Sequence, residues 1–136
     1  MQKLWSDDLL TGLRIIDTQH REFFTRVEGL LTECMSVDAE AGYPRTFEFL
    51  RSYVDKHFAT EEGLMDLHAF PQAGFHKSQH RWFLTEIDRI HTEALRGGAT
   101  ASVQTQFNYL LIDWFRSHIR GVDVILVAYL KDKPPA

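Results

Sequence analysis

The chain has 136 residues and a mass of 15.8 kDa, and its 44% hydrophobic and 12% aromatic content is enough for one domain with a packed core. A net charge of −4, a pI of about 5.9 and the lack of any basic run argue against a nucleic-acid-binding protein. No apolar stretch approaches the roughly 20 residues of a membrane-spanning helix, and the first residues show no signal-peptide pattern, so we expect a cytoplasmic protein.

An N-terminal arm is expected over residues 1–17, where polar and apolar residues mix without a clean period. Beyond it, four stretches carry apolar residues at three- and four-residue steps, which is the pattern of amphipathic helices. These stretches are residues 18–35, about 44–68, about 71–95 and about 100–130. Residues 131–136, which include two prolines, are expected to form a C-terminal tail.

Prolines and glycines separate the four stretches. Pro44 is expected in the first turn of the second helix, where its missing N–H costs little. No segment shows the sustained period-two alternation of a β-strand. The sequence therefore predicts an all-α fold, an up-down-up-down four-helix bundle with an extended N-terminal segment, forming a single domain over residues 1–136.

The seven histidines of the chain are not scattered at random. Five lie on the predicted apolar faces, with at least one on every helix: His20, His57, His76, His80 and His118. Glu61 follows His57 by four residues, and His80 follows His76 by four. Residues at this spacing share a helix face, with Cβ atoms about 5–6 Å apart, so two side chains can converge on one ion.

A lone histidine on an apolar face is more often a hydrogen-bonded core residue than a metal ligand, and a single pair at this spacing is a weak signal. Five inward histidines together with a carboxylate would be a costly core without metal, because each buried polar group needs a partner. We therefore expect a metal centre. His68 and His91 fall outside this set and are expected at the surface or in a structural role. The single cysteine, Cys34, is expected to be a small residue on a helix face.

Imidazole and carboxylate ligands without thiolate suit iron, zinc, copper or nickel. The ligands are too many for one tetrahedral zinc ion and fit two metals. Ferritin-like di-iron bundles use Glu-x-x-His motifs and more glutamates than histidines, whereas this chain has the reverse balance. A histidine-rich set stabilises ferric charge less, which favours reversible binding over strongly oxidising chemistry.

The order of these motifs resembles that of the hemerythrin family, and of its single-domain bacterial members most closely. The resemblance covers nearly the whole chain. The matching motifs are Ile16-Asp17-x-x-His20-x-x-Phe23, His57-Phe58-x-x-Glu61-Glu62, His76-x-x-x-His80-x-x-Phe83 and Trp114-x-x-x-His118-Ile119-x-x-x-Asp123.

The resemblance implies two iron ions joined by an oxo or hydroxo bridge. The implied ligands of one iron are His76, His80 and His118, those of the other are His20 and His57, and Glu61 and Asp123 would bridge both. The second iron would then keep an open position for dioxygen. The apolar residues implied around this oxygen pocket are Phe24, Phe58, Trp114 and Phe115, which would exclude water.

One spacing conflicts with a regular helix. His118 and Asp123 are five residues apart, so at about 100° per residue they would point roughly 140° apart. Either Asp123 reaches around the helix, or a single-turn π-bulge lies between the two residues, with Gly121 easing the distortion. The sequence alone leaves both alternatives open.

The function that the resemblance implies is reversible dioxygen binding for transport, storage or delivery, in a non-enzymatic protein. The expected partner is dioxygen, with an oxygen-consuming enzyme or a membrane as candidate delivery targets, no nucleic acid, and a monomer as the working unit. An oxygen or redox sensor is an alternative, and a di-iron peroxidase-type enzyme ranks below it.

Overall fold

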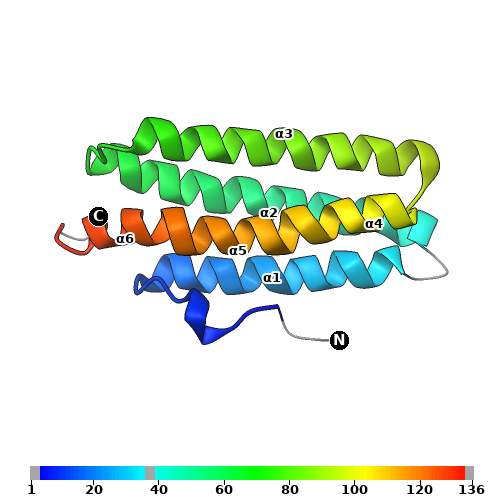
Figure 1. Cartoon of the computed structure of the whole chain (residues 1–136), viewed down its shortest axis with the longest axis horizontal. Coiled ribbons are helices and arrows are strands. Elements are labelled where there is room, and N and C mark those ends of the chain that lie inside the picture. The colour runs from blue at the N-terminus through cyan, green and yellow to red at the C-terminus, as the bar shows by residue number, and fades with distance from the viewer. Residues whose placement is uncertain (1–3, 36–38, 134–136) are drawn as a thin grey trace.

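The computed structural model describes residues 4–35 and 39–133. Its helices pack as four antiparallel rods, with α1 against α2, α2 against α3, and α4 against both α3 and α1 (Figure 1). The rods are α1 (Arg14–Cys34), α2 (Ala39–Leu67), α3 (Ala73–Gly97), and a fourth made of α4 (Ala101–Asn108), η2 (Tyr109–Trp114), α5 (Phe115–His118), η3 (Ile119–Asp123) and α6 (Val124–Leu130). The described ranges contain no strand, and the predicted all-α four-helix bundle is confirmed.

The first helix begins at Arg14, four residues before the predicted start at Thr18. The reason is the side chain of Asp17, which folds back over the entering chain. Its carboxylate accepts hydrogen bonds from the Thr11 backbone N–H and hydroxyl, both at 2.7 Å, and from the Gly12 N–H at 3.1 Å. Gly12 has a φ of 97°, a backbone conformation that glycine adopts freely and that is strained for a residue with a side chain. A Cβ at this position would also lie 2.5 Å from Lys131 Nζ.

The second helix begins at Ala39, so the predicted start at Pro44 was wrong. Pro44 lies inside the helix, in its second turn, where the ring removes one N–H from the hydrogen-bond ladder. The missing hydrogen bond lies close to the start of the helix, and α2 continues beyond Pro44 for 23 further residues to Leu67. Part of the predicted break between the first two helices, residues 36–38, lies outside the described residues.

The third helix begins at Ala73 instead of Pro71, a shift within the usual uncertainty of helix ends. The fourth rod starts after Thr100, whose side-chain oxygen accepts a hydrogen bond from the Val103 N–H at 3.2 Å, as an N-cap does. Two π-helical stretches, η2 and η3, interrupt this rod.

The arm before α1 runs beside that helix (Figure 1). The short 3-10 helix η1 (Asp7–Leu9) inserts Leu9 into the core, where it is 1% exposed. Arg116 donates a hydrogen bond to the Leu4 carbonyl, and Arg120 pairs with Asp8, so the arm is held to the fourth rod.

The apolar core falls into two clusters. The larger is rich in phenylalanine, and the smaller consists of Ile16, Met65, Phe70, Leu126, Val127 and Leu130. A layer of buried polar residues lies between them, since each helix passes from one cluster through this layer to the other. None of the helices in the described ranges is both long enough and apolar enough to cross a bilayer.

Candidate metal centre

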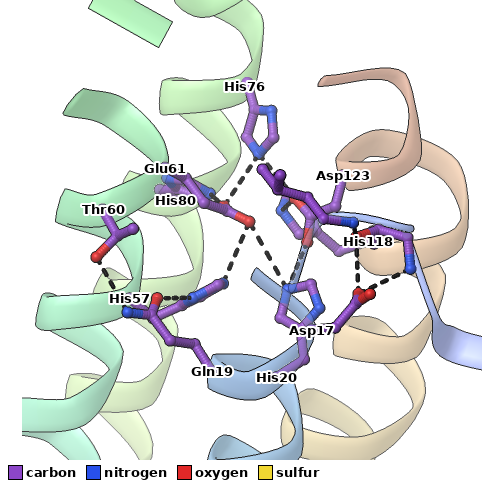
Figure 2. Close-up of polar contacts among 12 residues, drawn as sticks. Asp17, Gln19, His20, His57, Thr60, Glu61, His76, His80, His118 and Asp123 are labelled. Atoms are coloured by element: carbon purple, nitrogen blue, oxygen red, sulfur yellow. Dashed lines mark hydrogen bonds and ion pairs between the residues drawn. The ribbon is translucent and has the colours of Figure 1, made fainter. Parts of the chain in front are cut away.

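The structure brings all seven predicted ligands into one buried layer of the bundle (Figure 2). The layer draws on every rod: the ligands are His20 from α1, His57 and Glu61 from α2, His76 and His80 from α3, His118 from α5 and Asp123 from η3. None is more than 3% exposed. Charged and polar side chains are rarely buried this completely without a partner of opposite charge or a metal.

The ligand atoms form two groups. The first comprises His76, His80 and His118 with both carboxylates, and the second comprises His20 and His57 with the same two carboxylates. Within each group the ligand atoms lie within 4.8 Å of one another. Glu61 and Asp123 belong to both groups, as carboxylates that bridge two ions would.

Each imidazole presents its Nε2 atom to a carboxylate oxygen. His20 and His76 Nε2 each lie 3.0 Å from Asp123, on opposite oxygens. His118 Nε2 is 3.2 Å from Asp123, while His57 and His80 Nε2 are 3.2 and 3.1 Å from Glu61. Opposite oxygens of one carboxylate therefore face different histidines, which is the arrangement required of a bridge.

The donor atoms fit metal ions because they lack other partners. The Nε2 atoms of the five histidines and all four oxygens of Glu61 and Asp123 are buried and make no hydrogen bond within the described residues. The Nε2 atom of a neutral imidazole and a carboxylate oxygen are both acceptors, so at 3.0–3.2 Å from each other they need a proton or a cation between them. Two cations bound by these atoms would meet that need for the whole layer.

The charges of the layer perturb one another. Burial lowers the pKa of His20, but its contacts with Asp123 and Glu61 outweigh burial and raise the pKa to about 9. The pKa of His76 also rises to about 9, for the same reasons. Burial raises the pKa of Glu61 and Asp123, yet the surrounding histidines pull both well below their usual range. The layer therefore holds two carboxylates that attract cations.

The π-helix η3 solves the spacing problem of Asp123. It covers Ile119–Asp123 and follows His118 directly, so the wider turn brings residues five apart onto the same side of the rod. Of the two alternatives that the sequence left open, the structure therefore shows the bulge. A Cβ at Gly121 would meet nothing within 4 Å, so the turn does not need glycine for space.

A chain of hydrogen bonds orients the ring of His57 (Figure 2). Thr60 donates its hydroxyl to the Lys56 carbonyl at 3.0 Å and accepts from Gln19 Nε2 at 3.2 Å. Gln19 must then turn its Oε1 toward His57 Nδ1, 2.8 Å away. His57 Nδ1 is thereby the donor, so its Nε2 carries the lone pair that a metal needs.

Two other histidines have similar supports. His80 Nδ1 lies 2.7 Å from Glu62 Oε2, and His118 Nδ1 lies 2.8 Å from Gln79 Oε1. No role was predicted from the sequence for Gln19, Glu62 or Gln79. Each is next in sequence to a predicted ligand on its own helix, and this adjacency is the signal by which they could have been found.

His20 and His76 differ, because their Nδ1 atoms have no hydrogen-bond partner among the described residues. His76 lines a cavity of about 30 Å³ whose walls include Phe70, Val122 and Ile125. This volume is enough for a water molecule, the usual partner of a buried polar atom beside a small cavity.

Phenyl rings cover the layer on the side of the larger core cluster. Phe115 lies 6.0 Å from the His20 ring and 6.3 Å from that of His57, and Phe58 stacks on His80 at 3.7 Å. Phe58 and Phe115 thus contact the ligands as predicted for the oxygen pocket, and a role there stays a prediction.

Two further aromatic residues complete the predicted pocket. Trp114 stacks on His118 with ring centroids 4.9 Å apart. Phe24 lies one layer further out, because its ring contacts in the described structure are with Trp5, Phe23 and Phe115 instead of with a histidine. Phe23, outside the predicted pocket set, stacks on Phe115 at 3.9 Å.

The histidines outside the layer have structural places. His91 Nδ1 lies 2.9 Å from the Tyr43 hydroxyl, and its ring stacks on Phe47 at 3.7 Å. His68 is half-buried just after α2, where its backbone carbonyl accepts a hydrogen bond from Tyr129. Cys34 is a buried residue at the end of α1, as predicted.

Comparisons with known proteins match most of the chain. The family model described as the hemerythrin HHE cation binding domain matches residues 11–130. Bacteriohemerythrins from Pseudomonas paraeruginosa and Stenotrophomonas maltophilia are each 32% identical over 120 residues, which cover 88% of this chain and 76% of theirs. A bacteriohemerythrin from Clostridium acetobutylicum is 22% identical over 123 residues, covering 88% of this chain and 95% of its own.

Proposed function

Because this chain belongs to the hemerythrin family, we propose that its buried layer holds two iron ions and binds dioxygen reversibly, as a carrier or store instead of an enzyme. The observation that carries the proposal is the pair of ligand groups sharing Glu61 and Asp123. One iron would be held by His76, His80 and His118, and the other by His20 and His57. Two ferrous ions bound there would supply the electrons that dioxygen binding requires.

The unequal number of histidines supports a position for dioxygen. Both groups share the same two carboxylates, but one has three imidazoles and the other two. Iron in such sites commonly takes up to six ligands, so the group of His20 and His57 leaves more room for an external molecule. The ring of Phe115 covers both of these histidines, at 6.0 and 6.3 Å.

The chain's own residues would keep the bound molecule from reacting further. Phe115 and Ile119 are fully buried, and Phe58 is 3% exposed. These side chains offer no proton and exclude water, which supports reversible binding over irreversible oxidation of the metals. The four rods also enclose the core within one chain, which supports a monomer as the carrying unit.

The test is an oxygen-cycling absorption spectrum with an iron count on the same sample. The protein is loaded with ferrous iron without air, exposed to oxygen and then flushed with inert gas. We expect two irons per chain and a visible band that appears with oxygen and fades on flushing. A band that never fades would favour a redox sensor or an enzyme, and the absence of bound iron would refute the proposal.

A matched pair of variants assigns the result to the site. His118→Gln removes one imidazole of the three-histidine group, and His91→Gln removes an imidazole that pairs with Tyr43 outside the layer. We expect the first variant to lose iron and the band, and the second to keep both. Equal losses in the two variants would contradict the assignment of ligands.

A further inference from the structure

A column of rings in contact joins the ligand layer to the surface. The Trp114 ring stacks on His118 with centroids 4.9 Å apart and an interplanar angle of 14°. The Trp82 ring follows, 5.5 Å from Trp114 and tilted by 34°. Trp82 is 45% exposed. Two indoles in contact therefore lead from a predicted metal ligand to solvent.

The chemistry of this column differs from that of the other rings around the layer. Indole and phenol rings lose a single electron far more readily than phenyl rings do. The other non-histidine rings that contact the ligand histidines are Phe58 and Phe115. Trp5 is separated from the layer, because its ring contact is with Phe24. Among the described ring contacts, Trp114 is thus the readily oxidised ring that touches a ligand.

We propose that Trp82 and Trp114 form a path along which single electrons travel from the surface to the metal centre, supplied by a small one-electron reductant at Trp82. The path rests on the proposed iron centre. Its use would arise when an oxidant reaches the centre after both irons have become ferric. Electrons then have to come from the protein, and the two indoles in contact offer them a route from the surface.

The electron balance can be written for hydrogen peroxide as the oxidant. Its conversion to two waters takes up two electrons and two protons, and the protons come from solvent, to which two one-electron donors of ascorbate or thiol type release one proton each on oxidation. Trp114 gives one electron to the centre, and Trp82 replaces it. The indole proton of Trp82 passes to solvent, because this ring is exposed, and an ascorbate- or thiol-type reductant returns an electron while water returns the proton. The reduction of each peroxide therefore requires two such single-electron transfers along the path and two one-electron donors.

The surroundings of Trp82 give a small reductant access to the indole. Trp82 lines a groove of about 350 Å³ between α3 and the fourth rod, whose apolar walls include Tyr109 and Leu110. Tyr109 is 56% exposed, so a second readily oxidised ring lies in the same groove. An electron donor in solution therefore reaches the outer end of the column without entering the ligand layer.

The experiment maps oxidised residues by mass spectrometry after adding hydrogen peroxide to the loaded protein, without reductant. The diferric protein is compared with protein loaded with zinc, which has no redox chemistry. We expect oxidation products at Trp82 with iron and their loss with zinc. In the iron-loaded Trp114→Phe variant, which keeps a ring in the column, Trp82 oxidation should fall to the zinc level.

Two internal references separate the path from direct attack by peroxide. Met35 is 75% exposed and should be oxidised equally in every sample, because peroxide reaches its thioether from solvent. Trp5 lies off the path and should not respond to the metal. In a Trp82→Phe variant, the oxidation products should instead form at Trp114, because an oxidised Trp114 can no longer take an electron from Trp82.

Equal oxidation of Trp82 with zinc, or in Trp114→Phe, would mean attack from solvent and would overturn the path. Unchanged Trp82 in iron-loaded protein would overturn it as well. Iron content and the oxygen-dependent band are measured on the same samples. A preparation that cycles oxygen normally while Trp82 stays intact refutes the path alone, whereas one that holds no iron refutes both proposals.

Discussion

Replacing Gln19 by leucine should weaken metal binding by roughly ten- to a hundredfold, the usual effect of removing a hydrogen bond that orients a metal-bound histidine. The structure allows the magnitude to be worked out. Gln19 Oε1 accepts from His57 Nδ1 at 2.8 Å, and both side chains are buried. A buried N–H left without an acceptor costs about 1–3 kcal/mol, which corresponds to roughly 5- to 140-fold in affinity.

A second variant tests the outer end of the hydrogen-bond chain that runs from Thr60 through Gln19 to His57. Thr60→Val keeps the shape of the side chain but removes the hydroxyl that accepts from Gln19 Nε2 at 3.2 Å. The Gln19 amide is then free to turn its Nε2 toward His57. We expect a smaller loss of about 1 kcal/mol, or roughly fivefold in affinity, because the direct bond to His57 can still form.

The assay is competition between the loaded protein and a chelator, combined with urea unfolding of the metal-free protein. The control is Gln104→Leu, which removes a 2.9 Å hydrogen bond to the Ala99 carbonyl at the far end of the bundle. Gln104→Leu should leave metal affinity unchanged. If Gln19→Leu holds metal as tightly as the unmodified protein, or if all three variants lose affinity equally, the reasoning about His57 is wrong.

Three further predictions follow from individual contacts. Phe115 is a fully buried ring stacked on Phe23, so Phe115→Ala should lower the free energy of unfolding measured in urea by about 3–5 kcal/mol and speed irreversible oxidation of the loaded protein. A loss of stability below about 1 kcal/mol would contradict the packing argument. Asp17→Ala removes a carboxylate that accepts three hydrogen bonds at the start of α1, so urea unfolding should show a loss of about 1.5–3 kcal/mol, and no loss would mean that the arm is held without it. A high-resolution crystal structure should show a water hydrogen-bonded to His76 Nδ1 in the adjoining cavity, and a dry cavity would refute this.

Much of the site could be predicted from the sequence, because its signals are local. Helical periodicity places residues four apart on one face, so His57 with Glu61 and His76 with His80 were identifiable as pairs. The five-residue step from His118 to Asp123 made a bulge one of two alternatives, since a regular helix would separate the two side chains, and only the structure decided between them. Their convergence on one layer required only that the four amphipathic faces meet in a bundle.

Tertiary structure decided what depends on contacts between distant segments. The start of α1 was misjudged because Asp17 bonds to Thr11 and Gly12 across a fold of the chain, which helix periodicity does not report. The support of His57 by Gln19 joins residues 38 apart, and that of His118 by Gln79 joins residues 39 apart.

The contact between Trp82 and Trp114 also joins segments that are distant in the sequence. Each tryptophan has an ordinary place on its own helix, and only the rotation of α3 against the fourth rod brings the two rings together. Periodicity within one helix determines which face turns inward, and so it determined which residues form the predicted metal-binding layer. The relative rotation and depth of neighbouring helices come from the packing of the whole core. Only the folded bundle therefore determined which residues orient the predicted ligands and which rings lead from them to the surface.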